Sequence, residues 1–192
     1  MSAFLAVYDR SGKKLGKKHL NAMMKKLNHR GPDGSDSVYL ENVFLSHHHL
    51  WITPQEVGEK QPLAYSSNNL FICFDGRLDN RDKIIDLIYS GNIGLEEKSD
   101  AALLLLLYEK LGDKCFDKLI GPYSITIYDK AKSRVICARD PLAERGFFYH
   151  ISNNTFIACS EEAPILYYPS VTKTLNEKTI AHFFAMEAPR DG

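Results

Sequence analysis

The start of the chain constrains its fold most, because an apolar segment begins almost at the first residue. Phe4 to Tyr8 reads as a β-strand, and the turn-forming residues 9–12 follow it. Chain ends usually fray unless a neighbouring element holds them. A strand this close to the terminus therefore predicts that the first residues are tied into a sheet.

Ser2 stands at the beginning of this strand and has two interpretations. Its side chain is small, the kind after which Met1 is usually trimmed, so Ser2 could carry a free α-amine. An α-amine has a pKa near neutrality and can act as general base for an N-terminal nucleophile. The simpler interpretation is that Ser2 only caps the strand, and residues 1–8 alone favour it.

The rest of the chain predicts many strands and a few helices. Helical spacing or capping signals favour helices at 18–27, 81–89, 101–111, 161–166 and 176–186. Apolar or alternating runs favour strands at 38–40, 43–45, 70–74, 123–129, 134–139, 146–151 and 155–160. Strands and helices are segregated rather than alternating, which favours an α+β fold with two sheets.

Composition excludes several classes of function. The 24 basic residues balance 24 acidic ones, so no net field attracts nucleic acid or an anionic membrane. The strongly apolar run 101–108 is too short to span a membrane, and no signal sequence is present, so we expect a cytoplasmic protein. The four cysteines are widely spaced without a CxxC pair, which predicts reduced core cysteines rather than a zinc site or disulfides.

Three short motifs carry chemistry-bearing side chains, each with a structural alternative. In a strand only His47 and His49 of the histidine run would share a face, and no nearby carboxylate or cysteine completes a metal site, so no metal is expected. The segment 75–77, Asp-Gly-Arg, could position a ligand, although a tight turn is the simpler interpretation. Arg139 and Asp140 predict a structural ion pair.

An ordered set of motifs favours functional interpretations over these structural alternatives. In chain order the set is Met1-Ser2-Ala3-Phe4, His29-Arg30-Gly31-Pro32-Asp33-Gly34, Ser46-His47-His48-His49-Leu50, Gln61-Pro62-Leu63, Phe74-Asp75-Gly76-Arg77-Leu78-Asp79-Asn80, Ser99-Asp100, Gly121-Pro122-Tyr123, Ala138-Arg139-Asp140-Pro141-Leu142 and Cys159-Ser160-Glu161. The set resembles the N-terminal glutamine amidotransferase domain of the asparagine synthetase family over essentially the whole chain. The resemblance implies an N-terminal-nucleophile (Ntn) hydrolase fold, a four-layer αββα sandwich of two antiparallel sheets.

The resemblance also assigns roles to six positions, several of which hold an unusual residue. Ser2 takes the place of a nucleophilic cysteine, and His49 that of an arginine that holds the glutamine α-carboxylate. Asp75 and Gly76 take the oxyanion-hole positions of an asparagine and a glycine. Arg77 replaces a glutamate that binds the substrate α-amine, whereas Asp100 matches an aspartate with that function.

These replacements predict a degenerate glutaminase site. Serine is a weaker nucleophile than a thiolate, and an ionised Asp75 would repel a developing oxyanion. His49 cannot form the bidentate carboxylate clamp that arginine forms. Arg77 places a cation where an ammonium group should bind, so we expect either a network with neighbouring residues 79 and 81 or a pair with Asp75.

The leading hypothesis is a domain, 1–186, that scaffolds an ATP-dependent synthetase domain in cis or in trans, with 187–192 starting the linker. Related members with altered sites, such as β-lactam synthetases and lasso-peptide cyclases, close an amide with an internal amine. ATP and Mg²⁺ are expected only in the synthetase domain, and a homodimer is a further partner we consider. One alternative is a Ser2-dependent amidohydrolase of altered specificity, and another is a module that binds an amino-acid-like molecule through Arg77 and Asp100.

Overall fold

Two antiparallel sheets form the centre of the protein in the computed structural model, which describes residues 1–65, 69–89 and 94–187. Sheet A has the strand order β2-β3-β1-β9-β8, formed by β1 (Ala3–Asp9), β2 (Ser35–Leu40), β3 (Val43–His48), β8 (Phe148–Ile151) and β9 (Thr155–Cys159). Sheet B has the order β4-β5-β6-β7, formed by β4 (Leu63–Tyr65), β5 (Leu70–Gly76), β6 (Tyr123–Asp129) and β7 (Arg134–Arg139).

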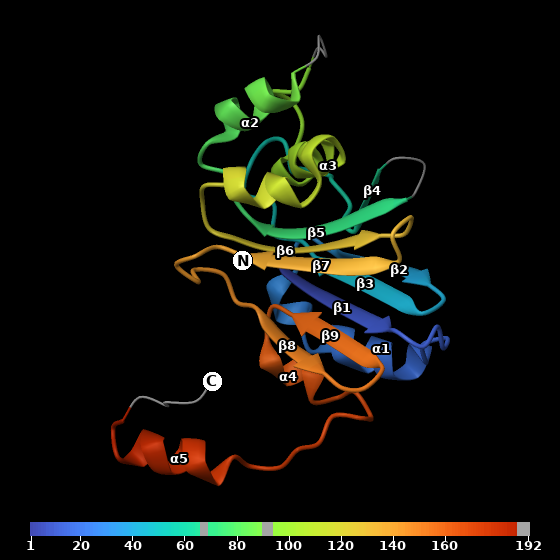
Figure 1. The fold of residues 1–192 in the computed structure, drawn as a ribbon, viewed down its shortest axis with the longest axis vertical. Coiled ribbons are helices and arrows are strands. Elements are labelled where there is room, and N and C mark those ends of the chain that lie inside the picture. Colours follow the sequence, from blue (N-terminus) through green and yellow to red (C-terminus); the bar gives the residue numbers. More distant parts are fainter. Residues whose placement is uncertain (66–68, 90–93, 188–192) are drawn as a thin grey trace.

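Helices cover the outer face of each sheet (Figure 1). The helices α1 (Lys17–Lys25) and α4 (Glu162–Ile165) pack on sheet A, whereas α2 (Arg81–Ile88), α3 (Asp100–Leu111) and the 3₁₀ segment η2 (Gly112–Lys118) pack on sheet B. A second 3₁₀ segment, η1 (Asn28–Arg30), follows α1, and α5 (Glu177–Phe184) stands apart from the body. The layers are therefore helix, sheet, sheet, helix, as expected of an αββα sandwich.

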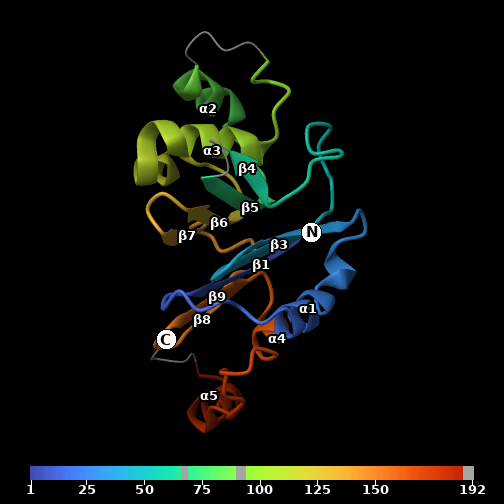
Figure 2. The same cartoon turned by 90° about the vertical axis from the view of Figure 1, so that its right-hand side faces the viewer.

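The first strand lies in the middle of sheet A and is buried on both faces. Leu5 and Val7 pack with α1 residues on one side, whereas Phe4 and Ala6 pack with Phe71 of sheet B on the other. The strand pairs with β3 and β9, from Ala3 opposite His48 to Asp9 opposite Thr155. The prediction that the chain start is held in a sheet is confirmed, and it places residue 2 at the end of a central strand (Figure 2).

Most predicted elements are present, several with shifted ends, and the differences at β5, β4 and α1 are described next. Asp75 and Gly76 continue β5 rather than turning out of it, because Gly76 pairs with Tyr123 across the ladder. A Cβ at Gly76 would meet the Pro122 carbonyl and lie 2.7 Å from the Cα of Tyr123, so only glycine permits this close pairing. The three-residue strand β4 was not predicted, and α1 ends at Lys25, before the expected boundary.

The cysteine and membrane predictions can be compared with the same structure. Cys73, Cys115, Cys137 and Cys159 are free, as predicted. Among the described residues, no helix is long and apolar enough to cross a membrane. The expected linker lies, from residue 188 onward, outside the described residues.

Candidate functional site

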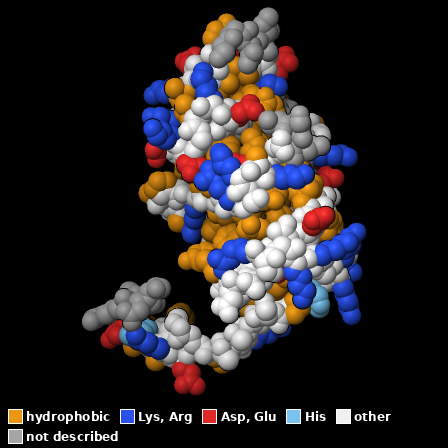
Figure 3. Space-filling view, turned by 45° about the vertical axis from the view of Figure 1, so that its right-hand side comes forward, with side chains coloured by type: hydrophobic (Ala, Val, Ile, Leu, Met, Phe, Trp, Pro, Cys, Tyr) orange, Lys and Arg blue, Asp and Glu red, His pale blue; other side chains and the backbone are white. Residues whose placement is uncertain are grey.

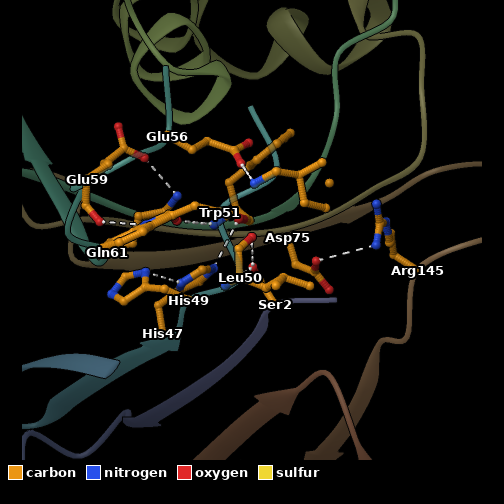
Figure 4. A pocket seen from close by; sticks show the side chains of 13 residues that line it. Ser2, His47, His49, Leu50, Trp51, Glu56, Glu59, Gln61, Asp75 and Arg145 are labelled. Atoms are coloured by element: carbon orange, nitrogen blue, oxygen red, sulfur yellow. Dashed lines mark hydrogen bonds and ion pairs between the residues drawn. The ribbon is translucent and has the colours of Figure 1, made fainter. Parts of the chain in front are cut away.

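A small pocket opens where β1 begins and where β3 and β5 end (Figure 4). Its lining comprises Ser2, His47, His49, Leu50, Trp51, Ile52, Glu56, Glu59, Gln61, Phe74, Asp75, Gly76 and Arg145. Four of the predicted site residues, at positions 2, 49, 75 and 76, are therefore brought together. The cavity holds only about 20 Å³, room for about one water molecule.

Ser2 is fixed by its hydroxyl group and by the strand that follows it. Its Oγ accepts a hydrogen bond from the Leu50 N–H at 3.0 Å and lies 3.3 Å from the Leu50 carbonyl, to which it donates. Two residues on, the Phe4 N–H donates to Ser160 Oγ at 2.9 Å, and the Ser160 N–H donates back to the Phe4 carbonyl at 3.1 Å. The start of the chain is therefore held on both sides, in a position that faces the pocket.

The glycine-rich motif 29–34 supports the strand end that carries the pocket histidines. The Asp33 N–H donates to the His49 carbonyl, and Asp33 Oδ2 accepts from the Trp51 N–H. A Cβ at Gly31 would lie 2.8 Å from the Cβ of His48, so this segment packs against the strand only with glycine there. The motif therefore acts as a support for residues 48–51.

A second set of contacts joins this motif to the distant Ser-Glu motif. Nε2 of His29 lies 3.0 Å, and Nε of Arg30 3.4 Å, from Oε1 of Glu161. These pairs connect the segment after α1 to the end of β9, on the same side of sheet A. Motifs far apart in the sequence thus meet around one end of the sheet.

His47 and His49 point to the same face, as strand alternation predicted, and they contact each other. Their Nδ1 atoms are 3.1 Å apart, and Nε2 of His47 lies 3.1 Å from the Phe74 carbonyl. Burial lowers the pKa of His47 to about 3, so this ring is neutral. Its Nε2–H donates to the carbonyl, which leaves its Nδ1 as the acceptor of the pair.

Both ring nitrogens of His49 have partners inside the protein. Nδ1 lies 3.1 Å from Nδ1 of His47, and Nε2 lies 3.1 Å from Oδ2 of Asp36. The His49 ring is therefore engaged on both sides. It is 3% exposed and has no ring N–H left for a ligand.

Asp75 is the most unusual group in the pocket. It is 2% exposed, its Oδ1 lies 3.7 Å from Nη1 of Arg145, and its Oδ2 is buried with no hydrogen-bond partner among the described residues. Burial raises the pKa of Asp75 to about 6, although Arg145 and Arg30 oppose the shift. The oxyanion-hole position of the resemblance is thus occupied by a carboxyl group in place of an amide donor.

Arg77 and Asp100 are not among the residues that line the pocket. Arg77 is exposed and its Nε lies 2.5 Å from Oδ1 of Asp79, in agreement with the expected local network. Asp100 is buried, pairs with Arg81 at 2.5 Å and accepts the Leu78 N–H at 2.8 Å. Both oxygens of Asp100 are therefore engaged within the fold.

Other pocket residues were missed at the sequence level. Glu59 has two uncharged hydrogen-bond donors. Its carboxylate accepts from the Ser99 hydroxyl and, at 3.0 Å, from the Gln61 amide. Burial raises the pKa of Glu59. Gln61 in turn accepts the Phe74 N–H at 2.8 Å. The Gln-Pro-Leu motif was a usable signal for Gln61, but the irregular loop gave none for Glu59.

Arg145 was also missed, although it follows a motif that the sequence singled out. The expected ion pair between Arg139 and Asp140 is wrong: Arg139 donates to the Ala143 carbonyl at 2.7 Å. Asp140 accepts the N–H groups of Glu144 and Arg145 at 3.0 and 3.3 Å instead. The aspartate therefore shapes the loop that carries Arg145 into the pocket.

The described residues contain no group of three or more histidine, cysteine, aspartate or glutamate side chains that could hold a metal ion. The pocket as folded is a closed polar network around Ser2. Among the residues that line it, Arg145 is a cation, and Glu56, Glu59 and Asp75 carry acidic side chains.

Comparison with known proteins adds the family context. Residues 1–191 match the family model of the glutamine amidotransferase domain. A putative asparagine synthetase (glutamine-hydrolyzing) 2 of Methanocaldococcus jannaschii is 31% identical over 197 residues, covering 92% of this chain and 38% of that protein. Asparagine synthetase (glutamine-hydrolyzing) 3 of Bacillus subtilis is 27% identical, covering 91% of this chain and 28% of that protein.

A solved structure shows the same fold at lower sequence identity. Glutamine phosphoribosylpyrophosphate amidotransferase from B. subtilis, complexed with ADP and GMP, superposes with a TM-score of 0.68 at 17% identity. The match covers 86% of this chain and 43% of that one. The chain thus spans less than half the length of the proteins to which it is compared.

Proposed function

Because the chain belongs to the glutamine amidotransferase domain family, and its longer relatives are named asparagine synthetases, we propose that it is a member without glutamine hydrolysis that scaffolds a synthetase domain. Any ATP-dependent, amide-forming step would belong to that other domain. The chain would have lost its glutamine site without gaining a site for another substrate.

One observation carries the proposal: both ring nitrogens of His49 are engaged inside the protein. The resemblance puts at this position an arginine that binds the glutamine α-carboxylate. A ligand carboxylate would have to displace His47 or Asp36 to reach an N–H of His49. Breaking the part-buried bond to the Asp36 carboxylate costs on the order of 1.5–3 kcal/mol.

The remaining recognition positions support the same conclusion. Asp75 can donate a hydrogen bond only when protonated, and loss of one oxyanion-hole donor costs about 10²–10³ in rate. Arg77 binds Asp79 outside the pocket, and Asp100 binds Arg81 and a backbone N–H. The cavity of about 20 Å³ is also too small for glutamine unless the loop 51–60 moves.

The scaffold function is supported by exposed apolar surface. α5 has no buried residue, and its Phe183 and Phe184 are almost four-fifths exposed. Figure 3 shows the C-terminal segment that carries α5 standing apart from the body, and hydrophobic side chains over the middle of the body. Such surface on a chain much shorter than its relatives fits a further domain packed against it.

The test is glutamate release from glutamine by the purified chain, with intact mass showing that Met1 is gone. We expect no release above that of the Ser2→Ala variant. Release at rates typical of enzymes, abolished by Ser2→Ala, would contradict the proposal. The scaffold function is tested by co-purification with the synthetase domain of the same protein, and by loss of that association when Phe183 and Phe184 are replaced by serine.

One observation favours a second candidate, a Ser2-dependent amidohydrolase of altered specificity. Ser2, Gly76 and Arg145 line one pocket, so a nucleophile, a backbone amide and a cation for an anionic substrate lie together. In that case the Ser2 amine would be the base. Quantitative retention of Met1 would exclude this candidate, because the amine would then be part of a peptide bond.

A further inference from the structure

Asp75 has a buried carboxylate oxygen that nothing in the described fold satisfies. Its Oδ1 has a long contact of 3.7 Å with Arg145, whereas Oδ2 has no hydrogen-bond partner. An uncompensated buried charge of this kind is costly, and native structures usually satisfy it. The oxygen therefore marks a place for a hydrogen-bond donor or a cation.

Charged and titratable groups reach this carboxylate from several elements. They are Ser2 at the start of β1, Arg30 of η1, His47 and His49 at the end of β3, Glu56 and Glu59 of the loop after it, and Arg145 of the loop before β8. Arg30 is already paired with Glu161, and His49 with Asp36. Glu56 accepts the N–H groups of Ile52 and Thr53.

Ser2 is the neighbour whose chemistry can change. It lies beside Asp75 in the close view of the pocket, at the end of a strand that is fixed on both sides (Figure 4). While Met1 is present, the Ser2 nitrogen belongs to a peptide bond and carries one proton. Removal of Met1 would turn that nitrogen into an ammonium group with three N–H donors and a positive charge.

We propose that Asp75 is the counter-ion of the mature N-terminus, and that it binds the α-ammonium of Ser2 once Met1 has been removed. The unsatisfied oxygen and the shared pocket carry this inference. Even with Met1 in place, the positive charge of the chain start is among the groups that favour the ionised form of Asp75. Trimming would move that charge from Met1 to Ser2, which lines the same pocket as Asp75.

The pairing has a chemical consequence for the amine. An opposite charge favours the protonated ammonium, so the α-amine pKa rises above its ordinary value of about 7.7–8.0. A protonated amine cannot accept a proton from the Ser2 hydroxyl, so it cannot act as general base. This inference rests on the proposed function and gives a physical reason for it, because Asp75 both removes an oxyanion donor and blocks the base.

The experiment titrates the amine itself. The trimmed chain, confirmed by intact mass, is labelled with a trace of acetic anhydride across pH 6–10, and acetylation of the N-terminal peptide is measured by mass spectrometry. We expect the labelling midpoint of the native chain to lie at least about one pH unit above that of Asp75→Asn. Asp79→Asn makes the same chemical change outside the pocket and should keep the native midpoint.

Equal midpoints in the native chain and in Asp75→Asn would overturn the proposal, as would retention of Met1 in every preparation. If Asp75→Asn does not fold, Arg145→Gln provides the second arm. Loss of the competing cation should raise the midpoint further, and an unchanged midpoint would count against the pairing. Glutamate release is recorded on the same samples, so a failure of the proposed function remains distinguishable from a failure of this pairing.

Discussion

Two buried aspartates lie at opposite ends of sheet B, Asp75 near the end of β5 and Asp129 at the end of β6, and both are 2% exposed. Asp129 accepts the Tyr108 hydroxyl at 2.9 Å and the Lys132 N–H at 3.1 Å, and it pairs with the Lys132 ammonium at 3.2 Å. Asp75 has only the long contact with Arg145 and one bare oxygen.

The pKa of the aspartate is therefore shifted in opposite directions at the two ends of the sheet. Burial alone would raise the pKa of Asp129, but the bonds from Tyr108 and Lys132 outweigh it and hold the pKa below its ordinary value. At Asp75 burial prevails and the pKa rises to about 6. The difference shows that Asp129 stabilises the fold, whereas Asp75 is a charge that the fold carries at some cost and that belongs to the pocket.

The largest expected effect comes from rebuilding the pocket around a neutral donor. We expect the combined substitutions Ser2→Cys, His49→Arg and Asp75→Asn to release glutamate from glutamine at least about 10²-fold faster than Ser2→Cys alone. The amide of the new asparagine would donate where Asp75 cannot. Coupled glutamate dehydrogenase measures the rate, and equal rates for the two variants would show that Asp75 and His49 are not the obstacle.

Removal of the satisfied aspartate should have the largest effect on stability. Asp129→Ala leaves the Tyr108 hydroxyl and the Lys132 N–H without their acceptor, so we expect a loss of about 2–4 kcal/mol in the free energy of unfolding. Urea denaturation measures it, with Asp79→Ala as a control on an exposed aspartate. A loss below about 1 kcal/mol would remove the contrast between the two ends of the sheet.

Removal of the unsatisfied charge at Asp75 should instead raise the free energy of unfolding. In the chain that keeps Met1, we expect Asp75→Asn to raise the free energy of unfolding at pH 7.5 by on the order of 1–3 kcal/mol. The folded pKa of Asp75 exceeds its unfolded value of about 3.9, so its ionisation costs stability as pH rises from about 4 to 6.

The pH dependence provides the check on this prediction. Well below pH 4 the carboxyl group is protonated in both folded and unfolded chains, and the advantage of Asp75→Asn should disappear. Asp129 behaves in the reverse way: its contribution is present above its unfolded pKa and is lost as pH falls through the lower folded value. A constant advantage of Asp75→Asn from pH 4 to 8 would contradict the raised pKa.

The smallest effect is expected at the exposed pair of Arg77 and Asp79. Arg77 has 61% of its side chain exposed, so solvent screens the interaction. We expect Arg77→Ala to leave the midpoint of thermal or urea denaturation within experimental error of the native midpoint. A clearly lower midpoint would show that the pair of Arg77 and Asp79 contributes to the stability of the fold.

The sequence predicted the architecture because strands that are buried on both faces are apolar along their length. The apolar start at Phe4 and the segregation of helices from strands led to a two-sheet fold, and strand alternation put His47 and His49 on one face. Spacing and capping signals predicted the helix at 101–111, and Ser99 Oγ accepts the Ala102 N–H at its start. These features depend on local spacing, which a single sequence displays.

The site was less accessible to sequence analysis, because its contacts join residues far apart in the chain. The resemblance indicated positions 77 and 100 as pocket residues, but the pairs with Asp79 and Arg81 depend on local side-chain geometry. Arg145 reaches Asp75 across 70 positions through a loop shaped by Asp140. Which partner a buried charge finds is a property of the assembled fold.

The most direct test of the account is whether the trimmed chain binds glutamine. Isothermal titration of L-glutamine into the Met1-free chain should show no saturable heat up to millimolar concentration, because His49 and Asp100 are engaged within the protein and Asp75 offers no amide donor. Saturable binding that Asp100→Asn abolishes would mean that these internal pairs open for the substrate, and the domain would then have to be regarded as a working glutamine site.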